Sequence, residues 1–199
     1  MKSIDVKGTA RNEFGKKAAK ELRKQDLIPC NLYGVERDEK GLPVAKAFTV
    51  SREEVRNLVY SPDIFSVNLT IDGVTVLAVM REIQFHPVKD SIQHIDFYQI
   101  TENKPIVMAV PVKLNGLAAG VKAGGKLEQV MRRVKAKAIY SIIPEKIEVD
   151  VTPLGIGKSF KVGDLNMEGI EFTSPKDAVI CTVMATRAAA AAEEEAAAE

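Results

Sequence analysis

Tryptophan is absent from the 199-residue sequence, which also contains only two cysteines and two histidines. The cysteines, Cys30 and Cys181, stand far apart in apolar surroundings, so we expect packed thiols in a reducing compartment rather than a disulfide framework. No stretch approaches the roughly 20 apolar residues that cross a bilayer, and the amino terminus has no apolar signal-like core. We therefore expect a cytoplasmic protein without a membrane partner.

Charge of one sign is not in excess either, because 28 basic residues stand against 27 acidic ones and the net charge is +1. The first 24 residues nevertheless contain eight bases and three acids, a local net charge of +5. A short helix is predicted over Gly15–Gln25, with small apolar residues on one side and five cations on one arc of the other. These cations are Lys16, Lys17, Lys20, Arg23 and Lys24. The arc indicates a surface for an anionic partner such as RNA, or else a solvated helix face.

Alternating apolar and polar residues predict strands around a second helix. Strands are expected after Ile28 and over Val44–Val50. Ser51 and Glu54 have the spacing of a capping box, which opens a helix that ends at Ser61-Pro62. The first half of the chain therefore combines short strands with two short helices.

A β-hairpin is predicted next, because two alternating segments, Phe65–Ile71 and Val74–Met80, flank the turn sequence Asp72-Gly73. The segment Ile83–Ile100 is also expected to be extended. Because side chains of a strand alternate between its two faces, Gln84 and His86 are expected to share a face. For the same reason His94, Asp96 and Tyr98 are expected to share a face, and Ile95 and Phe97 should point to the opposite side. These patterns predict a small, mostly antiparallel β-barrel with two helices, ending near residue 100.

A second all-β domain is predicted in the other half of the chain. Its strands are expected over Ile106–Leu114, Arg132–Tyr140, Ile147–Val151 and Ala178–Met184. The sequence ends in an alanine- and glutamate-rich stretch of low complexity. The predicted organisation is a mostly β protein with a barrel domain over 1–100, a β domain over 101–187 and a tail over 188–199.

Three motifs could carry enzyme chemistry. Segment 120–126 has the glycine and lysine spacing of a P-loop, but Leu127 occupies the position of the required Ser or Thr, so nucleotide binding is not expected. His86 and His94, with nearby aspartates, permit a metal site of low specificity. Cys30 could pair with a histidine as a nucleophile, but no signature surrounds it and a packing role is favoured.

A basic row is predicted in the second domain, because Arg133, Lys135 and Lys137 alternate with apolar residues along one strand. The row is either a second RNA-binding strip or the solvated face of a strand. No aromatic residue is interleaved to decide between the two readings.

Several ordered blocks of the sequence resemble one known family. They are Arg11 with Gly15-Lys16, Ala18–Arg23, Ile28-Pro29, Leu32–Gly34, Gln84, His86-Pro87, Lys89 and His94–Phe97 in the first half, and Gly120-Val121, Gly124-Gly125, Ile142–Pro144 and Ile147–Val151 in the second. Together they resemble the bacterial 5S rRNA-binding ribosomal protein family, of the large-subunit protein number twenty-five and two-domain general stress protein CTC type. The resemblance covers nearly all of the chain except the tail.

The resemblance implies a non-enzymatic, ribosome-associated component of the large subunit that binds 5S rRNA through its N-terminal domain. It implies no cofactor, metal or small-molecule substrate. The RNA-binding residues that it implies are Arg11, Lys16, Lys20, Arg23, Tyr33, Gln84, His86, Lys89, His94 and Asp96. Lys20 stands where many members have an arginine, so a point charge replaces a forked guanidinium. A stress-linked protein-interaction module and a small metal-dependent enzyme are the alternatives from other classes.

Overall fold

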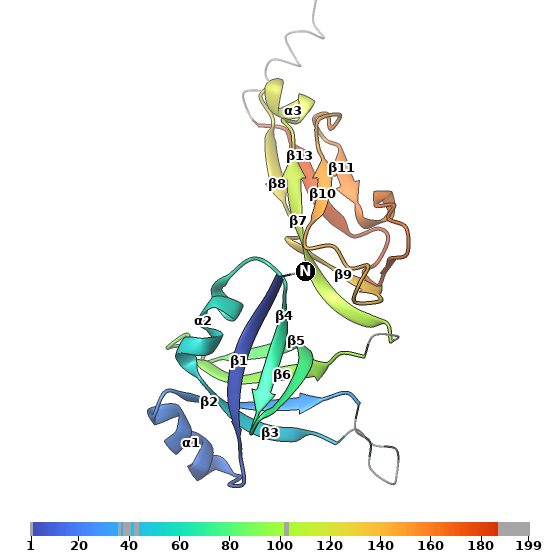
Figure 1. The fold of residues 1–199 in the computed structure, drawn as a ribbon. Coiled ribbons are helices and arrows are strands. Elements are labelled where there is room, and N and C mark those ends of the chain that lie inside the picture. The colour runs from blue at the N-terminus through green and yellow to red at the C-terminus, as the bar shows by residue number, and fades with distance from the viewer. Residues whose placement is uncertain (1, 36, 38–40, 42–43, 102–103, 187–199) are drawn as a thin grey trace, which may run out of the picture. The chain divides into compact units, whose positions relative to one another are not determined.

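The computed structural model describes residues 2–35, 37, 41, 44–101 and 104–186. The chain divides into two compact units, Met1–Lys104 and Pro105–Glu199, each with its own sheets (Figure 1). The predicted low-complexity tail, 188–199, lies outside the described residues. Within the described ranges, no helix has both the length and the apolar character needed to cross a membrane.

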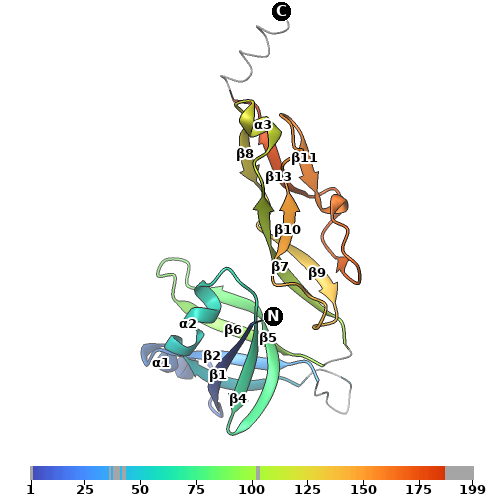
Figure 2. The same cartoon turned by 45° about the horizontal axis from the view of Figure 1, so that its top comes forward.

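Six strands of the first unit close into a β-barrel (Figure 1, Figure 2). They are β1 (Lys2–Ala10), β2 (Leu27–Tyr33), β3 (Lys46–Ser51), β4 (Phe65–Ile71), β5 (Val74–Phe85) and β6 (Ile92–Gln99). Around the barrel they follow the order β1-β3-β2-β6-β5-β4. Four neighbouring pairs are antiparallel, whereas β1 with β4 and β2 with β6 are parallel. The predicted small, mostly antiparallel barrel with two helices is confirmed.

The barrel interior is filled by apolar side chains around two phenylalanines. Phe48 on β3 and Phe97 on β6 are fully buried, and their ring centres lie 5.7 Å apart. Ile95, two residues before Phe97, is also fully buried, as the predicted alternation requires. Cys30 on β2 is buried too, and desolvation raises the pKa of its thiol to about 12. A thiol that stays protonated is a packing group and not a nucleophile.

Helix α2 (Arg52–Tyr60) is fixed to the barrel at its start. The hydroxyl of Ser51 accepts a hydrogen bond from the backbone N–H of Glu53 at 3.3 Å. The carboxylate of Glu54 does not complete the predicted capping box but accepts from the backbone N–H of Lys7 on β1, at 3.1 Å. This bond and two buried apolar side chains of the helix hold α2 against the barrel wall.

Two parts of the barrel differ from the sequence prediction. Strand β1 was not predicted, because Ile4 and Val6 are its only large apolar residues and its pairing partners lie far along the chain. The predicted extended segment Ile83–Ile100 is interrupted by a turn over residues 86–91, which separates β5 from β6. Asp90 adopts a positive φ of 50° in this turn, a conformation that aspartate tolerates better than most residues.

The second unit contains two sheets, with strand orders β10-β7-β9-β12 and β11-β13-β8. The strands are β7 (Ile106–Asn115), β8 (Lys126–Gln129), β9 (Arg133–Ala138), β10 (Ile147–Asp150), β11 (Ser159–Lys161), β12 (Glu171–Phe172) and β13 (Val179–Met184). A short helix α3 (Ala119–Lys122) and a 3-10 turn η1 (Val162–Asp164) are also present. The unit is therefore mostly β rather than all β. Strands β8, β11 and β12 were not predicted, because each contains a single apolar residue and so shows no alternation.

The glycine-rich segment 120–126 packs against backbone of its own unit. The N–H of Gly120 donates to the carbonyl of Leu154, and the N–H of Gly125 donates to the carbonyl of Gly120, each at 2.8 Å. A Cβ at Gly120 would lie only 2.6 Å from the backbone nitrogen of Ile156. The glycines thus permit close backbone approach, and these N–H groups are already bonded within the chain. The packing agrees with the prediction that this segment is not a P-loop.

Candidate nucleic-acid interface

Three neighbouring strands, β2, β6 and β5, place polar side chains on one outer face of the barrel. Because alternate residues of β6 are buried inside, the residues between them point outward. The pairing register sets Asp96 between Asn31 of β2 and Glu82 of β5. It also sets His94 beside Gln84 of β5. We call this set the polar face: Asn31, Tyr33, Glu82, Gln84, His94, Asp96 and Tyr98.

His94 and Asp96 contact each other on the polar face. His94 Nδ1 lies 3.2 Å from Asp96 Oδ1, and their side chains are 22% and 24% exposed. The contact restrains the imidazole and the carboxylate in defined orientations. Each side chain has a further polar atom, Nε2 of the ring and Oδ2 of the carboxylate, that can bond to a base edge or a ribose hydroxyl.

The turn between β5 and β6 carries two further predicted residues, His86 and Lys89. His86 Nδ1 accepts from the backbone N–H groups of Val88 at 3.2 Å and Lys89 at 3.3 Å. A neutral imidazole that accepts at Nδ1 carries its proton on Nε2, which can donate to a partner. His86 therefore shapes the turn that presents the exposed Lys89.

Helix α1 (Lys16–Lys24) lies against β2 and carries the predicted cations. Lys16 and Lys20 are exposed, whereas Arg23 is half-buried. Arg23 Nε and Nη2 both donate to the backbone carbonyl of Gln93, at 3.1 and 3.0 Å. Because Gln93 lies in β6, these two bonds tie the basic helix to the strand at the centre of the polar face.

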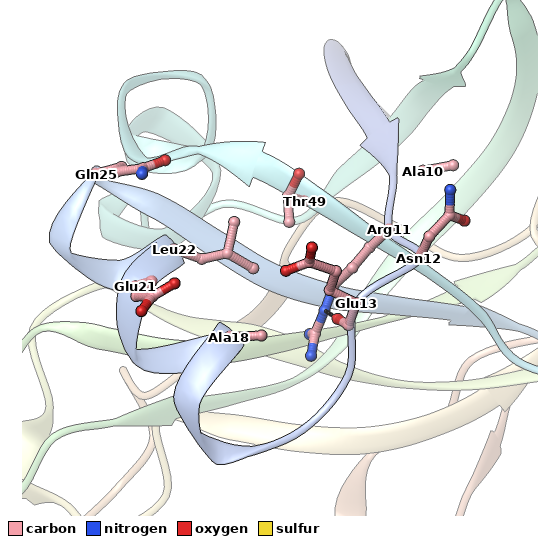
Figure 3. A pocket seen from close by; sticks show the side chains of 9 residues that line it. All are labelled: Ala10, Arg11, Asn12, Glu13, Ala18, Glu21, Leu22, Gln25 and Thr49. Carbon is pink, nitrogen blue, oxygen red and sulfur yellow. Dashed lines mark hydrogen bonds between the residues drawn. The ribbon is translucent and has the colours of Figure 1, made fainter.

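Arg11 lies beside β3, where its backbone N–H donates to the carbonyl of Ala47 at 3.0 Å. Its Nε donates to the backbone carbonyl of Glu13 at 2.6 Å, and its guanidinium carbon lies 5.3 Å from the centre of the Phe14 ring. Arg11 also lines a pocket of about 300 Å³ together with the apolar side of α1 and Thr49 of β3 (Figure 3). In the strand order of the barrel, β2 lies between β3 and β6. The structure thus joins Arg23 to the central strand of the polar face, whereas Arg11 lies beside β3.

Two tyrosines extend the polar face along β2 and β6. Tyr33 and Tyr98 are register partners, and their rings meet edge to face with centres 5.9 Å apart. Tyr98, Asn31 and Glu82 were not among the predicted site residues. Tyr98 shares the period-two face of His94 and Asp96, so the sequence contained a signal for it. Asn31 and Glu82 join the face only through the register between strands, which no local pattern specifies.

The enzyme chemistries raised by the sequence are not assembled in the described part of the chain. No three His, Cys, Asp or Glu side chains gather there in a way that could hold a metal ion. Cys30 is buried inside the barrel, whereas His94 lies on the outer face. These two side chains therefore cannot form a nucleophile pair.

The predicted basic row lies on strand β9 of the second unit. Arg133, Lys135 and Lys137 are exposed, and the residues between them are buried. Lys137 Nζ lies 3.0 Å from Glu171 Oε2 on the neighbouring strand β12. One of the three cations is therefore paired within its own sheet.

A closed barrel with an external basic helix and a polar outer face is typical of nucleic-acid-binding proteins. Comparison with known proteins agrees with this class. The profile of the Ribosomal L25p family matches residues 6–97, and that of Ribosomal protein TL5, C-terminal domain, matches residues 105–187.

Full-length relatives give the particular family. The chain is 59% identical to large ribosomal subunit protein bL25 of Phocaeicola vulgatus, over 95% of this chain and 96% of the relative. It is 55% identical to the protein of the same name from Bacteroides thetaiotaomicron, over 95% of each chain, and 54% identical to that of Porphyromonas gingivalis, over 95% of this chain and 96% of the relative. The chain belongs to the ribosomal L25p family. The predicted resemblance is confirmed, and the family is one of ribosomal proteins and not of enzymes.

Proposed function

We propose that this protein is a structural component of the large ribosomal subunit and binds 5S rRNA through its N-terminal domain. Its relatives are named as large-subunit proteins, and it is 54–59% identical to three of them over almost its whole length. As a ribosomal component it works in the cytoplasm. The single structural observation that carries the proposal is the pair of bonds from Arg23 to Gln93, which joins a basic helix to a polar face.

The basic helix α1 and the polar face have different roles in this proposal. RNA helices expose phosphates and ribose hydroxyls around a wide, shallow minor groove, so cations supply affinity and polar groups supply selectivity. The exposed lysines of α1 contact phosphates, while the His94–Asp96 pair and Gln84 contact base edges or hydroxyls. The full proposed set of RNA-binding residues is Arg11, Lys16, Lys20, Arg23, Tyr33, Gln84, His86, Lys89, His94 and Asp96.

The proposal assigns binding to the first of three regions, 1–100, 101–187 and 188–199. We expect the full chain to co-sediment with large ribosomal subunits at moderate salt. We also expect the fragment 1–104 to fold and to bind 5S rRNA within about threefold of the full chain, because its barrel and helices are complete. Gradient sedimentation, filter binding and circular dichroism measure these properties.

A protein found wholly in the ribosome-free fraction of growing cells would contradict the proposal and favour the interaction module. If the full chain binds 5S rRNA but the folded fragment does not, binding belongs outside the first region. An unrelated RNA duplex is the control for non-specific attraction in both measurements.

Arg23 is expected to act mainly by holding α1 in place. Arg23→Lys keeps the positive charge but cannot make both bonds to Gln93 from one planar fork. We expect binding to 5S rRNA to weaken about tenfold with an unchanged dependence on salt. Filter binding over a salt series checks both quantities.

The matched variant is Lys20→Gln, which removes an exposed charge from the same helix. Its binding should weaken and its salt slope should flatten by about one unit, as for one lost phosphate contact. If Arg23→Lys binds like the wild type, Arg23 serves as a point charge and not as an anchor for the helix.

A further inference from the structure

A second group of cations lies beside the polar face, around the ring of Tyr98. The guanidinium carbon of Arg81 lies 5.9 Å from the ring centre, and Lys104 Nζ lies 5.7 Å from it. Tyr33 meets the same ring edge to face. We call Tyr33, Arg81, Tyr98 and Lys104 the tyrosine–cation cluster.

The exposure of Arg81 depends on an irregularity in β5. The register between β5 and β6 shifts between Met80 and Glu82, so that Arg81 is the extra residue of a bulge. Met80 packs against the core, yet Arg81 and Glu82 are both exposed. In a regular strand, strict alternation would turn one of these two charged side chains inward. The bulge therefore adds a cation to the outer surface without burying a charge.

Both cations of the cluster lie close to the ring of Tyr98. Within the described ranges, neither Arg81 nor Lys104 forms an ion pair with a carboxylate. Contact with a ring face restrains a cation without neutralising its charge. Burial raises the pKa of the Tyr33 phenol, and Arg81 nearby acts in the opposite direction. Arg81 also forms a side-chain hydrogen bond with Tyr33, while the nearby carboxylates of Asp96 and Glu82 raise the pKa of the phenol further.

We propose that the tyrosine–cation cluster is an additional RNA-backbone site, in which Arg81 and Lys104 bind phosphates of the strand that leaves the polar face. This inference rests on the proposed function and extends its contact surface. The cluster adjoins that face directly, because Tyr98 follows Asp96 on the same side of β6 and Tyr33 follows Asn31 on β2. The planar fork of Arg81 matches two phosphate oxygens, and Lys104 adds a point charge.

The test compares two double variants of the full chain that remove the same charge. Arg81→Gln/Lys104→Gln removes the cluster cations. Lys7→Gln/Arg56→Gln removes two exposed cations from β1 and α2. Strand β1 lies three strands from β6 in either direction around the barrel, and α2 packs against β1 and β3, so these control positions face away from the polar face.

We expect the cluster variant to bind 5S rRNA at least tenfold more weakly than the wild type, with a salt slope flatter by about one to two units. The control variant should lose less than about threefold, since only general attraction changes. Tyr98→Leu, which keeps both cations but removes their ring, should weaken binding by about threefold, whereas Tyr98→Phe should not. Filter binding over a salt series, with folding checked by circular dichroism, gives these values.

Two different results would contradict this inference, and the measurements distinguish them. If the wild type prefers 5S rRNA to an unrelated duplex and the two double variants lose affinity equally, the cluster is not an RNA site although the proposed function stands. If the wild type shows no such preference, the proposed function is wrong and the inference fails with it.

Discussion

Replacing Phe97 by alanine is expected to lower the free energy of unfolding of the first unit by about 3–5 kcal/mol. The ring is fully buried in the barrel and contacts the ring of Phe48. Its strand pairs with both β2 and β5, so a cavity at this position loosens three strands at once. Hydrogen exchange of the β6 amides over a urea series, read by mass spectrometry, measures the loss in the full chain.

Phe85→Ala is the matched control for this prediction. Phe85 ends the neighbouring strand β5 and is 43% exposed, so its replacement should cost less than about 1 kcal/mol. Equal destabilisation by the two replacements would mean that the interior of the barrel does not depend on the buried ring. That outcome would contradict the core described above.

Replacing Asp96 by alanine is expected to separate specific from non-specific RNA binding. Loss of a carboxylate acceptor at the polar face should weaken binding to 5S rRNA by roughly 1–3 kcal/mol. Removal of a negative charge should leave binding to an unrelated duplex unchanged or make it tighter. The two changes have opposite signs, so filter binding to both RNAs over a salt series distinguishes the roles of the carboxylate.

Asp5→Ala provides the same change of charge on β1, at the opposite side of the barrel from β6. Asp5 accepts a hydrogen bond from Asn68 at 2.8 Å and is exposed. We expect this variant to bind both RNAs as the wild type does or slightly more tightly. If Asp96→Ala behaves in the same way as Asp5→Ala, Asp96 does not belong to the recognition site.

Local patterns predicted the faces of β6 and the cationic arc of α1. Ile95 and Phe97 are buried and His94 and Asp96 lie outside because a strand alternates with a period of two residues. Strand β1 could not be predicted in the same way. Of its residues only Val6 is buried, and the strand forms through pairing with β3 and β4, which lie some 40 to 60 residues away.

The sequence predicted the site residues one by one, but the contacts that each of them makes depend on tertiary structure. The side chain of Arg23 donates to a carbonyl 70 residues further along the chain. The sequence therefore predicted a cation at this position but could not predict that it fixes helix α1 to strand β6. Arg81 is exposed at a bulge, which a simple alternating pattern does not reveal. The tests of Arg23, Arg81 and Asp96 address these partner-dependent roles.

The position of β6 in the barrel also determines when the polar face can form during synthesis of the chain. It is the last of the six strands to be made, yet it lies between β2 and β5 and contributes the centre of the polar face. A nascent chain that has reached only β5 has the basic helix but neither His94 and Asp96 nor the carbonyl that anchors Arg23. If the proposed site binds 5S rRNA, we therefore expect selective capture of RNA to begin only when the barrel closes, whereas an unfinished chain would attract RNA through charge alone.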